Sequence, residues 1–282
     1  MFHGQSTLPY LVLVIILRVV FRSRAKFIYD MHDLNERPPS FGVKAYLRYS
    51  VFYLIEHLIS MSNVQVITVS KGLSRIFYKR FKKSASVVYN VAFEIDGCAG
   101  IWGGCSDGSA GAGIVYFGLI KPDRLPFDMV ENVLGRNPSG VFDVFGRSPS
   151  GVGSAYEARL SKLSTTTTLR LCGAYNPKEM GFLSAYRYSW LCFESDRLNI
   201  RYCMPNKLFQ SLSAGLCCVI SDRLVEARVL FGGGCIGYRE FIADGAGCST
   251  LEEKSIDWAG IEGRMRRVAE RSRGVFLSVC AM

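Results

Sequence analysis

The pattern of apolar and polar positions in the first third of the chain predicts helices that alternate with short strands. Apolar residues recur at helical spacing over 45–61, and Ser70 can cap a further helix at 71–81. The apolar stretch 8–21 is shorter than the ~20 residues that a membrane span needs, so it predicts a buried helix. The predicted strands are 26–30, 64–70 and 87–91.

Glycine and serine are dense over residues 96–113, which is typical of a flexible linker between domains. A second alternating series begins directly after it. Its predicted strands are 114–118, 140–146, 168–173, 189–193, 216–220 and 235–238, and its predicted helices include 177–186 and 256–273. We therefore expect an α/β protein with domains at 1–95 and 114–282, each with a parallel sheet that binds ligands at the carboxyl ends of its strands.

One loop, helix and turn in the second series carries candidate chemistry. Pro205 suits the first turn of a helix, and Gly215 suits its left-handed end. The free N–H groups near Asn206 and Lys207 can hold a phosphate, and Gln210 can hydrogen-bond a neutral polar group of the same ligand. An ordinary capped helix in an α/β domain has the same pattern, so spacing alone leaves both interpretations open.

Composition indicates a globular protein, and the distribution of charge indicates an anionic partner. The chain has 282 residues, of which 49% are hydrophobic and 21% charged, and this excludes a disordered chain. The formal net charge is +10. Residues 1–96 hold 13 Lys or Arg against 6 Asp or Glu, and the remainder holds 21 against 18. The basic first part suits an anionic partner: membrane lipid, lipid-linked phosphate or nucleic acid.

Cysteine and histidine usage gives little sign of a metal site. None of the ten cysteines forms a C-x-x-C pair, which predicts reduced, buried thiols in a cytoplasmic protein. The three histidines, His3, His32 and His57, lack the spacing of zinc ligands.

The segment 199–215 resembles the donor-site motif of glycosyltransferase family 4, whose members are retaining, nucleotide-sugar-dependent enzymes of GT-B fold. The residues that carry the resemblance are Asn199-x-x-Tyr202-x-x-Pro205-Asn-Lys-Leu-Phe-Gln-x-x-x-Ala-Gly215. Gln210 stands where the family has a Glu that binds the donor ribose, and it keeps an acceptor oxygen but loses the charge. Tyr202 stands where many members have a second Glu.

Weaker similarities extend the resemblance over nearly the whole chain. Tyr29-Asp-Met-His-Asp-Leu34 is similar to a loop of the family's first domain, and segments 66–70 and 115–118 are similar to strands of its two domains. Family members begin with a Gly-rich strand, loop and helix, whereas this chain begins with a stretch similar to the end of a later strand. We therefore expect two Rossmann-like domains of GT-B type with the first incomplete. The chain would then be a fragment, depend on a second chain, or be degenerate.

The resemblance also implies a site for the donor diphosphate. Lys207 would contact it, supported by Lys121 or Arg124. Gly146 and Asn206 would let backbone or amide groups approach the ligand. Cationic side chains and helix N-termini neutralise the diphosphate in such enzymes, so no metal or further cofactor is expected. The alternatives are solvated loop charges at Lys121 and Arg124, and a plain strand-ending turn at Gly146.

Two further residues are candidates for contact with the sugar or the acceptor. His32 lies after a predicted strand between Asp30 and Asp33, and the resemblance places it at the cleft. Glu194, with Asp196 nearby, follows a predicted strand of the second domain. The alternatives are a loop histidine bonded to Asp33 and surface carboxylates.

The run 71–83 has six basic residues interleaved with Ile76, Phe77 and Phe81. It can dock on anionic lipid, as in family members that act on lipid-linked acceptors, or it can be an ordinary surface helix. Nucleic acid is not expected, because no stacking platform accompanies the charges. The expected location is cytoplasmic, with peripheral contact at the inner face of the membrane.

The sequence thus predicts a glycosyltransferase that moves a sugar from a nucleotide-sugar to a glycan or lipid-linked acceptor, in surface polysaccharide synthesis. A non-catalytic or truncated protein of this fold, which binds nucleotide or membrane without turnover, is the first alternative. A sugar-nucleotide epimerase of GT-B fold is the second.

Overall fold

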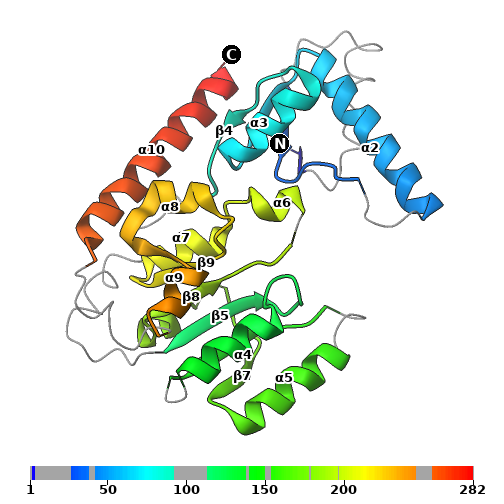
Figure 1. Cartoon of the computed structure of the whole chain (residues 1–282). Helices are drawn as coiled ribbons and strands as arrows, with labels where there is room; N and C mark the ends of the chain where they lie inside the picture. Colours follow the sequence, from blue (N-terminus) through cyan, green and yellow to red (C-terminus); the bar gives the residue numbers. More distant parts are fainter. Residues whose placement is uncertain are drawn as a thin grey trace. The chain divides into compact units, whose positions relative to one another are not determined.

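The computed structural model describes most of the chain in two compact units (Figure 1). The described residues are 2–3, 27–37, 42–91, 113–137, 140–149, 154–177, 179–195, 197–245 and 256–281. The first unit comprises Met1–Asn90, Asp196–Met204 and Arg267–Met282, and the second comprises Val91–Ser195 and Pro205–Arg266. The predicted helix at 8–21 and nearly all of the predicted linker lie outside the described residues.

The first unit is built on a parallel sheet of four described strands in the order β1-β2-β3-β4. The strands are β1 (Phe2–His3), β2 (Ile28–Met31), β3 (Gln65–Thr68) and β4 (Ser86–Val87). Helix α2 (Val43–Met61) joins β2 to β3, and α3 (Lys71–Phe81) joins β3 to β4. The strand predicted at 87–91 is therefore wrong in its extent, because pairing ends at Val87.

Helix α3 begins and ends where the sequence predicts. The Ser70 hydroxyl accepts a hydrogen bond from the N–H of Leu73 at 3.1 Å, which caps the first turn. Leu73, Phe77 and Phe81 recur every four residues, so all three side chains are buried against the sheet.

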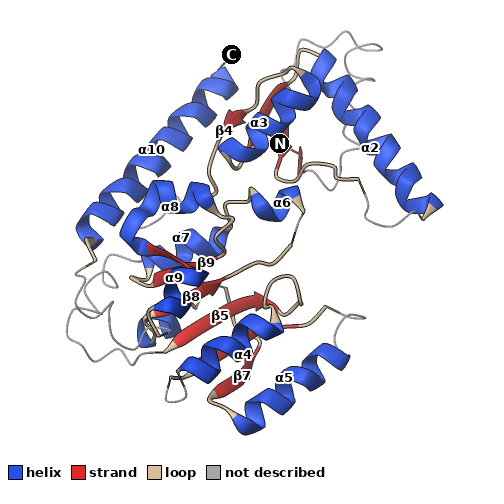
Figure 2. Ribbon diagram, in the orientation of Figure 1, coloured by secondary structure: helices blue, strands red, loops and turns tan. Residues whose placement is uncertain are grey.

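The second unit is built on a parallel sheet of six described strands in the order β10-β9-β8-β5-β6-β7. The strands are β5 (Ile114–Leu119), β6 (Phe142–Arg147), β7 (Leu169–Gly173), β8 (Tyr188–Leu191), β9 (Cys217–Ile220) and β10 (Cys235–Gly237). The helices are α4 (Phe127–Arg136), α5 (Ser154–Thr166), α7 (Asn206–Ser213), α8 (Val225–Phe231) and α9 (Tyr238–Ala243), with 3-10 turns at Gly181–Ala185 and Gly232–Gly234 (Figure 2).

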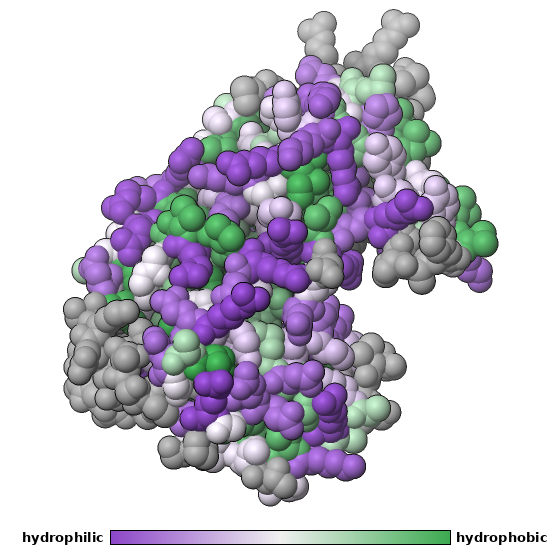
Figure 3. All heavy atoms as spheres, viewed as in Figure 1, coloured by the Kyte–Doolittle hydropathy of each residue, from purple (hydrophilic) through white to green (hydrophobic). Residues whose placement is uncertain are grey.

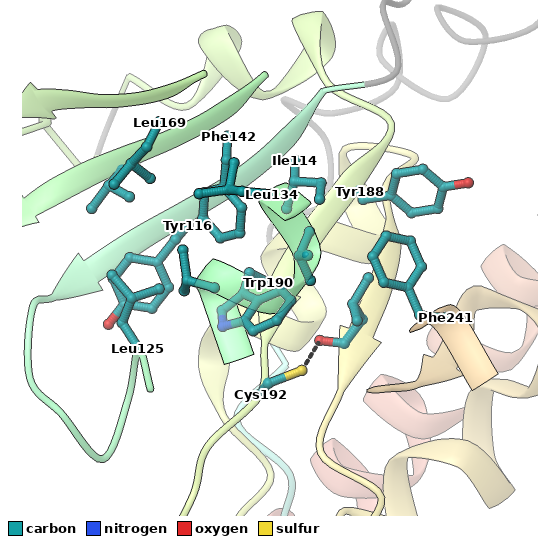
Figure 4. Packing of buried hydrophobic residues seen from close by; sticks show 14 of the residues in the cluster. Ile114, Tyr116, Leu125, Leu134, Phe142, Leu169, Tyr188, Trp190, Cys192 and Phe241 are labelled. Carbon is teal, nitrogen blue, oxygen red and sulfur yellow. Dashed lines mark hydrogen bonds between the residues drawn. The ribbon is translucent and has the colours of Figure 1, made fainter. Parts of the chain in front are cut away.

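Large rings fill the core of this second sheet (Figure 4). Phe142 and Trp190 lie edge to face with ring centroids 5.4 Å apart, and Tyr188 packs on Phe241 at 5.1 Å. The Cys192 thiol is buried and donates a hydrogen bond to the carbonyl of Val219. Because these side chains come from neighbouring strands and a covering helix, they hold the sheet and that helix together.

Three predictions about elements are corrected. The helix predicted at 177–186 is only the 3-10 turn Gly181–Ala185. The final helix α10 (Trp258–Ala281) runs eight residues beyond its predicted end at 273, and it begins in the second unit and ends in the first. The segment Asp196–Met204, which includes the short helix α6 (Leu198–Arg201), belongs to the first unit although the sequence assigns it to the second domain.

Candidate functional site

The candidate site lies in the second unit, where β5 and β6 end beside the start of α7. Phe117 pairs with Phe145 and Gly118 with Gly146 along the two strands. The loop 120–126 follows β5 and leads into α4. The carboxyl ends of parallel strands are where ligands bind in open α/β sheets, so this edge is the place to look for a ligand.

Helix α7 is fixed by its ends and by its buried face. Pro205 is the N-cap, one residue before the first turn in which the sequence places it, and no side chain of the described residues caps the helix start. Gly215 adopts the predicted left-handed conformation, with φ 75°. The Ser211 hydroxyl donates to that of Ser189 at 2.7 Å, which ties α7 to β8. Because no side chain from the described part of the chain caps the helix start, the N–H groups of Asn206 and Lys207 remain available to a ligand.

The side chain of Lys207 lies over the end of β5. Its ammonium is 4.9 Å from the ring centroid of Tyr116 and 5.7 Å from that of Phe117. A Cβ atom on Gly118 would stand 1.5 Å from the Lys207 Nζ, and Gly118 has φ 139°. Only glycine leaves room for the ammonium and adopts this backbone readily.

Lys207 is a mostly buried cation without an anionic partner. No carboxylate pairs with it within the described parts of the chain. Burial, and to a smaller extent the positive charge of Arg124, lower its pKa to about 8. A buried charge is costly unless it is paired, so the arrangement suits a bound anion.

Arg124 is held at the same edge of the sheet by its loop. The N–H groups of Arg124 and Leu125 both donate to the carbonyl of Lys121, at 3.0 and 2.9 Å. The guanidinium of Arg124 lies 4.6 Å from the ring centroid of Phe193. Lys121, at the start of this turn, is partly exposed. We call Gly118, Arg124, Lys207 and the first turn of α7 the cationic site.

The structure places the other predicted residues of the second unit around this site. Asn206 and Gln210 are exposed on α7, one turn apart. Glu194 is exposed after β8, and its N–H donates to the carbonyl of Asp123 at 3.1 Å, which brings its segment to the loop of Arg124. Asp196 lies outside the described residues.

Gly146 has a packing role that the sequence does not reveal. It lies within β6, one residue before the strand ends. A Cβ atom on Gly146 would stand 1.8 Å from the carbonyl oxygen of Gly118. The glycine is therefore needed for the close approach of β5 and β6, while its contact with a ligand stays a prediction.

Sequence reasoning missed a cluster of aromatic side chains beside the ends of β5 and β6. Phe145 and Phe182 have ring centroids 4.4 Å apart, and Tyr175 lies 5.9 Å from Phe117 and 6.0 Å from Phe182. Phe145, Tyr175 and Phe182 are only partly buried. The four rings are scattered over 66 residues of sequence, so no periodic signal links them.

His32 lies in the first unit, in the loop after β2. Its Nδ1 is 2.9 Å from a carboxylate oxygen of the buried Asp30, and its Nε2 is 3.3 Å from the side-chain oxygen of Asn90. The nearby carboxylate of Asp30 raises the pKa of His32, while burial opposes the shift. The carboxylate that pairs with His32 is therefore Asp30, and not Asp33 as one of the sequence alternatives has it.

Tyr202 also belongs to the first unit. A Cβ atom on Gly72 would stand 2.4 Å from its ring, so the ring packs directly on the start of α3. The neighbouring Asn199 side chain accepts from the N–H of Leu34 and donates to its carbonyl, both at 2.7 Å. These contacts anchor the segment that precedes α7. A contact of Tyr202 with the donor stays a prediction.

No metal centre is visible in the described part of the chain, where no group of three or more His, Cys, Asp or Glu side chains could hold an ion. No helix within the described ranges is long and apolar enough to cross a membrane.

Comparisons with known proteins decide the fold. The structure of Anabaena HepE in complex with UDP and glucose matches 96% of this chain and 76% of its own, with a TM-score of 0.68 and 13% identity. An α,α-trehalose-phosphate synthase (UDP-forming) from Burkholderia vietnamiensis matches 98% of this chain and 71% of its own, with a TM-score of 0.66 and 11% identity. The fold is of GT-B type.

A third match with this GT-B fold is WaaG, a glycosyltransferase involved in lipopolysaccharide biosynthesis. It covers 97% of this chain and 79% of its own, with a TM-score of 0.52 and 13% identity. No family model and no curated protein matches the sequence. At these identities the likeness shows the fold and leaves the donor and acceptor to be inferred from the site.

Proposed function

We propose that this chain is a retaining glycosyltransferase of the family 4 type. It moves a sugar from a nucleotide-sugar to a glycan or lipid-linked acceptor, in surface polysaccharide synthesis. The observation that carries the proposal is the unpaired, mostly buried ammonium of Lys207 beside Gly118 at the start of α7. The complexes of HepE with UDP and with UDP-glucose support a uridine diphosphate donor.

The proposed chemistry depends on positive groups that lie where negative charge develops during the reaction. When the bond between the anomeric carbon and the diphosphate breaks, negative charge grows on the leaving diphosphate. Lys207, Arg124 and the first N–H groups of α7 stabilise that charge, and Lys121 and Asn206 add contacts at the rim. Because these groups neutralise the diphosphate, the reaction needs no metal. The oxygen of the acceptor hydroxyl forms the new bond on the same face of the sugar, and its proton passes to an oxygen of the leaving diphosphate.

The remaining predicted residues have roles that follow from their chemistry. Gln210 would hydrogen-bond the donor ribose through its amide. Glu194 would bond sugar hydroxyls. His32, whose pKa is raised by Asp30, keeps its proton to higher pH and would donate to the sugar or the acceptor. Gly146 and Tyr202 would line the donor pocket.

The proposed location is cytoplasmic, with peripheral contact at the anionic inner face of the membrane. The basic run 71–83 supplies the charge for this contact. Its apolar members Phe77 and Phe81 are buried in the first unit, so α3 offers cations rather than an apolar face to lipid.

A non-catalytic nucleotide-binding protein of the same fold is the second candidate, and Gln210 in place of the family's Glu favours it. An assay of UDP release from UDP-glucose, with and without oligosaccharide acceptors, separates the two. Glycosyl transfer predicts turnover that falls in Lys207→Ala and persists in Lys162→Ala, an exposed lysine on α5. Gln210→Glu is expected to raise donor affinity. No turnover in the native chain or in Gln210→Glu would leave only the non-catalytic candidate.

A further inference from the structure

Helix α2 carries an apolar stripe on its exposed side. Its members recur at intervals of three or four residues, which confines them to a sector about 80° wide at 100° per residue. They are Val43, Leu47, Val51, Leu54, Leu58 and Met61, which are 84%, 64%, 39%, 56%, 41% and 74% exposed. We call these six side chains the α2 stripe. Figure 3 shows hydrophobic surface where α2 lies.

The α2 stripe is separate from the face that packs on the sheet. Ile55 and Ile59 are buried in the core of the first unit, and Phe52 packs against it. A surface helix of a globular protein needs one apolar face, whereas α2 has two. A contiguous exposed apolar surface of this kind marks an interaction site.

The exposed charges that α2 and α3 themselves carry are all positive. The only acidic residue of α2, Glu56, is 2% exposed and accepts a hydrogen bond from the N–H of Asn35, and α3 has no acidic residue. The exposed cations of the two helices and of the C-cap of α3 are Lys44, Arg48, Lys71, Arg75, Lys79 and Lys82. Within the described residues of these two helices, therefore, no carboxylate is exposed.

The two helices present this charge and the stripe on one face of the sheet. Both belong to right-handed crossovers between successive parallel strands, which places them on the same side. They also touch, because the rings of Tyr53 on α2 and Phe81 on α3 have centroids 5.3 Å apart. The cations of α3 and the α2 stripe therefore belong to a single surface of the first unit.

We propose that this surface docks on a bilayer that contains anionic lipid, with the α2 stripe in the acyl boundary and the cations at the headgroups. Interfacial helices combine these two features, and each cation near an anionic leaflet adds to the attraction. The stripe supplies the apolar contact that α3 lacks. The inference rests on the proposed function, since a lipid-linked acceptor lies in the bilayer.

The test is flotation of the full chain with vesicles of phosphatidylcholine alone and with vesicles of phosphatidylcholine and phosphatidylglycerol, whose surface is anionic like that of a cytoplasmic leaflet. We expect binding to the anionic vesicles that weakens at high salt. Leu47→Ser with Leu54→Ser is expected to lower the vesicle partition coefficient at least about tenfold. The matched control, Val225→Ser with Val229→Ser, removes two exposed apolar side chains from α8 and is expected to change nothing.

Several results would overturn the proposal. One is the absence of binding to anionic vesicles. Another is equal binding by the stripe variant. A third is a fall of several degrees in Tm, or a change in oligomeric state, in the stripe variant, because the stripe would then be covered by another chain segment or a second copy. Calorimetric titration with UDP, run in parallel, reports on the proposed function alone, since the stripe variant keeps the cationic site intact.

Discussion

At the scale of single residues, the account depends on the pairing of Lys207 with Gly118. The sequence predicts Lys207 as a phosphate contact, because it follows Pro205 at a helix start. The sequence does not predict that the Lys207 ammonium lies over Gly118 at the end of β5, because the two residues are 89 positions apart. One sequence alternative paired His32 with its neighbour Asp33, whereas the structure pairs it with Asp30, two residues earlier at the end of β2.

Substitution of Gly118 by alanine tests this pairing. The new Cβ would stand 1.5 Å from the Lys207 Nζ, and the φ of 139° strains any other residue by about 1–3 kcal/mol. We expect Gly118→Ala to displace the ammonium and to weaken UDP binding in calorimetry by about as much as Lys207→Ala. Gly135→Ala is the control, because its Cβ would meet nothing within 4 Å. Unchanged affinity in Gly118→Ala would refute the contact.

The pH dependence of nucleotide binding follows from the lowered pKa of Lys207. With a pKa of about 8, the ammonium is charged at pH 7 and loses its proton as the pH rises. UDP affinity is expected to fall by roughly tenfold between pH 7 and pH 9. Lys207→Ala should lack this dependence. Folding has the opposite sign: because the unfolded chain holds the proton to higher pH, Lys207 makes the folded state more stable as pH rises from about 8 toward 10.

At the scale of elements, the periodic patterns predicted most helices and strands well. Helix α3 begins and ends as predicted because its cap and its apolar spacing agree. The helix predicted at 177–186 was wrong because the apolar residues of this segment pack in the aromatic cluster at the strand ends and do not form one helical face. The loop Leu34–Glu36 was not foreseen as a structural element, although α2, α3 and α6 all bind it through side-chain hydrogen bonds.

Asn199 is one of two side chains that join α6 to this loop; the other is Glu36, whose carboxylate accepts from the N–H groups of Leu198 and Asn199. Asn199→Ala would remove both hydrogen bonds to the backbone of Leu34 and leave its partly buried N–H and carbonyl unpaired. We expect a loss of about 1–3 kcal/mol in the free energy of unfolding, measured by urea denaturation. Asn132→Ala, on the exposed side of α4, serves as the control. A loss no larger than the control's would show that the contact contributes nothing.

At the scale of the whole molecule, the two alternating series predicted two parallel-sheet units. They could not predict that the chain returns to the first unit at Asp196–Met204 and again at Arg267–Met282. These returns depend on contacts such as that of Asn199 with Leu34, 165 residues apart, or of Ser272 with Tyr89, which no local pattern encodes. The donor-site helix α7 thus begins directly after a segment that is anchored in the other unit.

The central claim is that the cationic site binds the diphosphate of a nucleotide. Calorimetric titration of UDP, ADP and GDP into the native chain and into Lys207→Ala tests it most directly, with Lys162→Ala as the matched control. The account predicts that at least one nucleotide binds. Its Kd should rise about 10- to 100-fold in Lys207→Ala, as expected for a charge-assisted hydrogen bond of ~1.5–3 kcal/mol, and stay unchanged in the control. Absence of binding by all three nucleotides, or equal binding by Lys207→Ala, would contradict it.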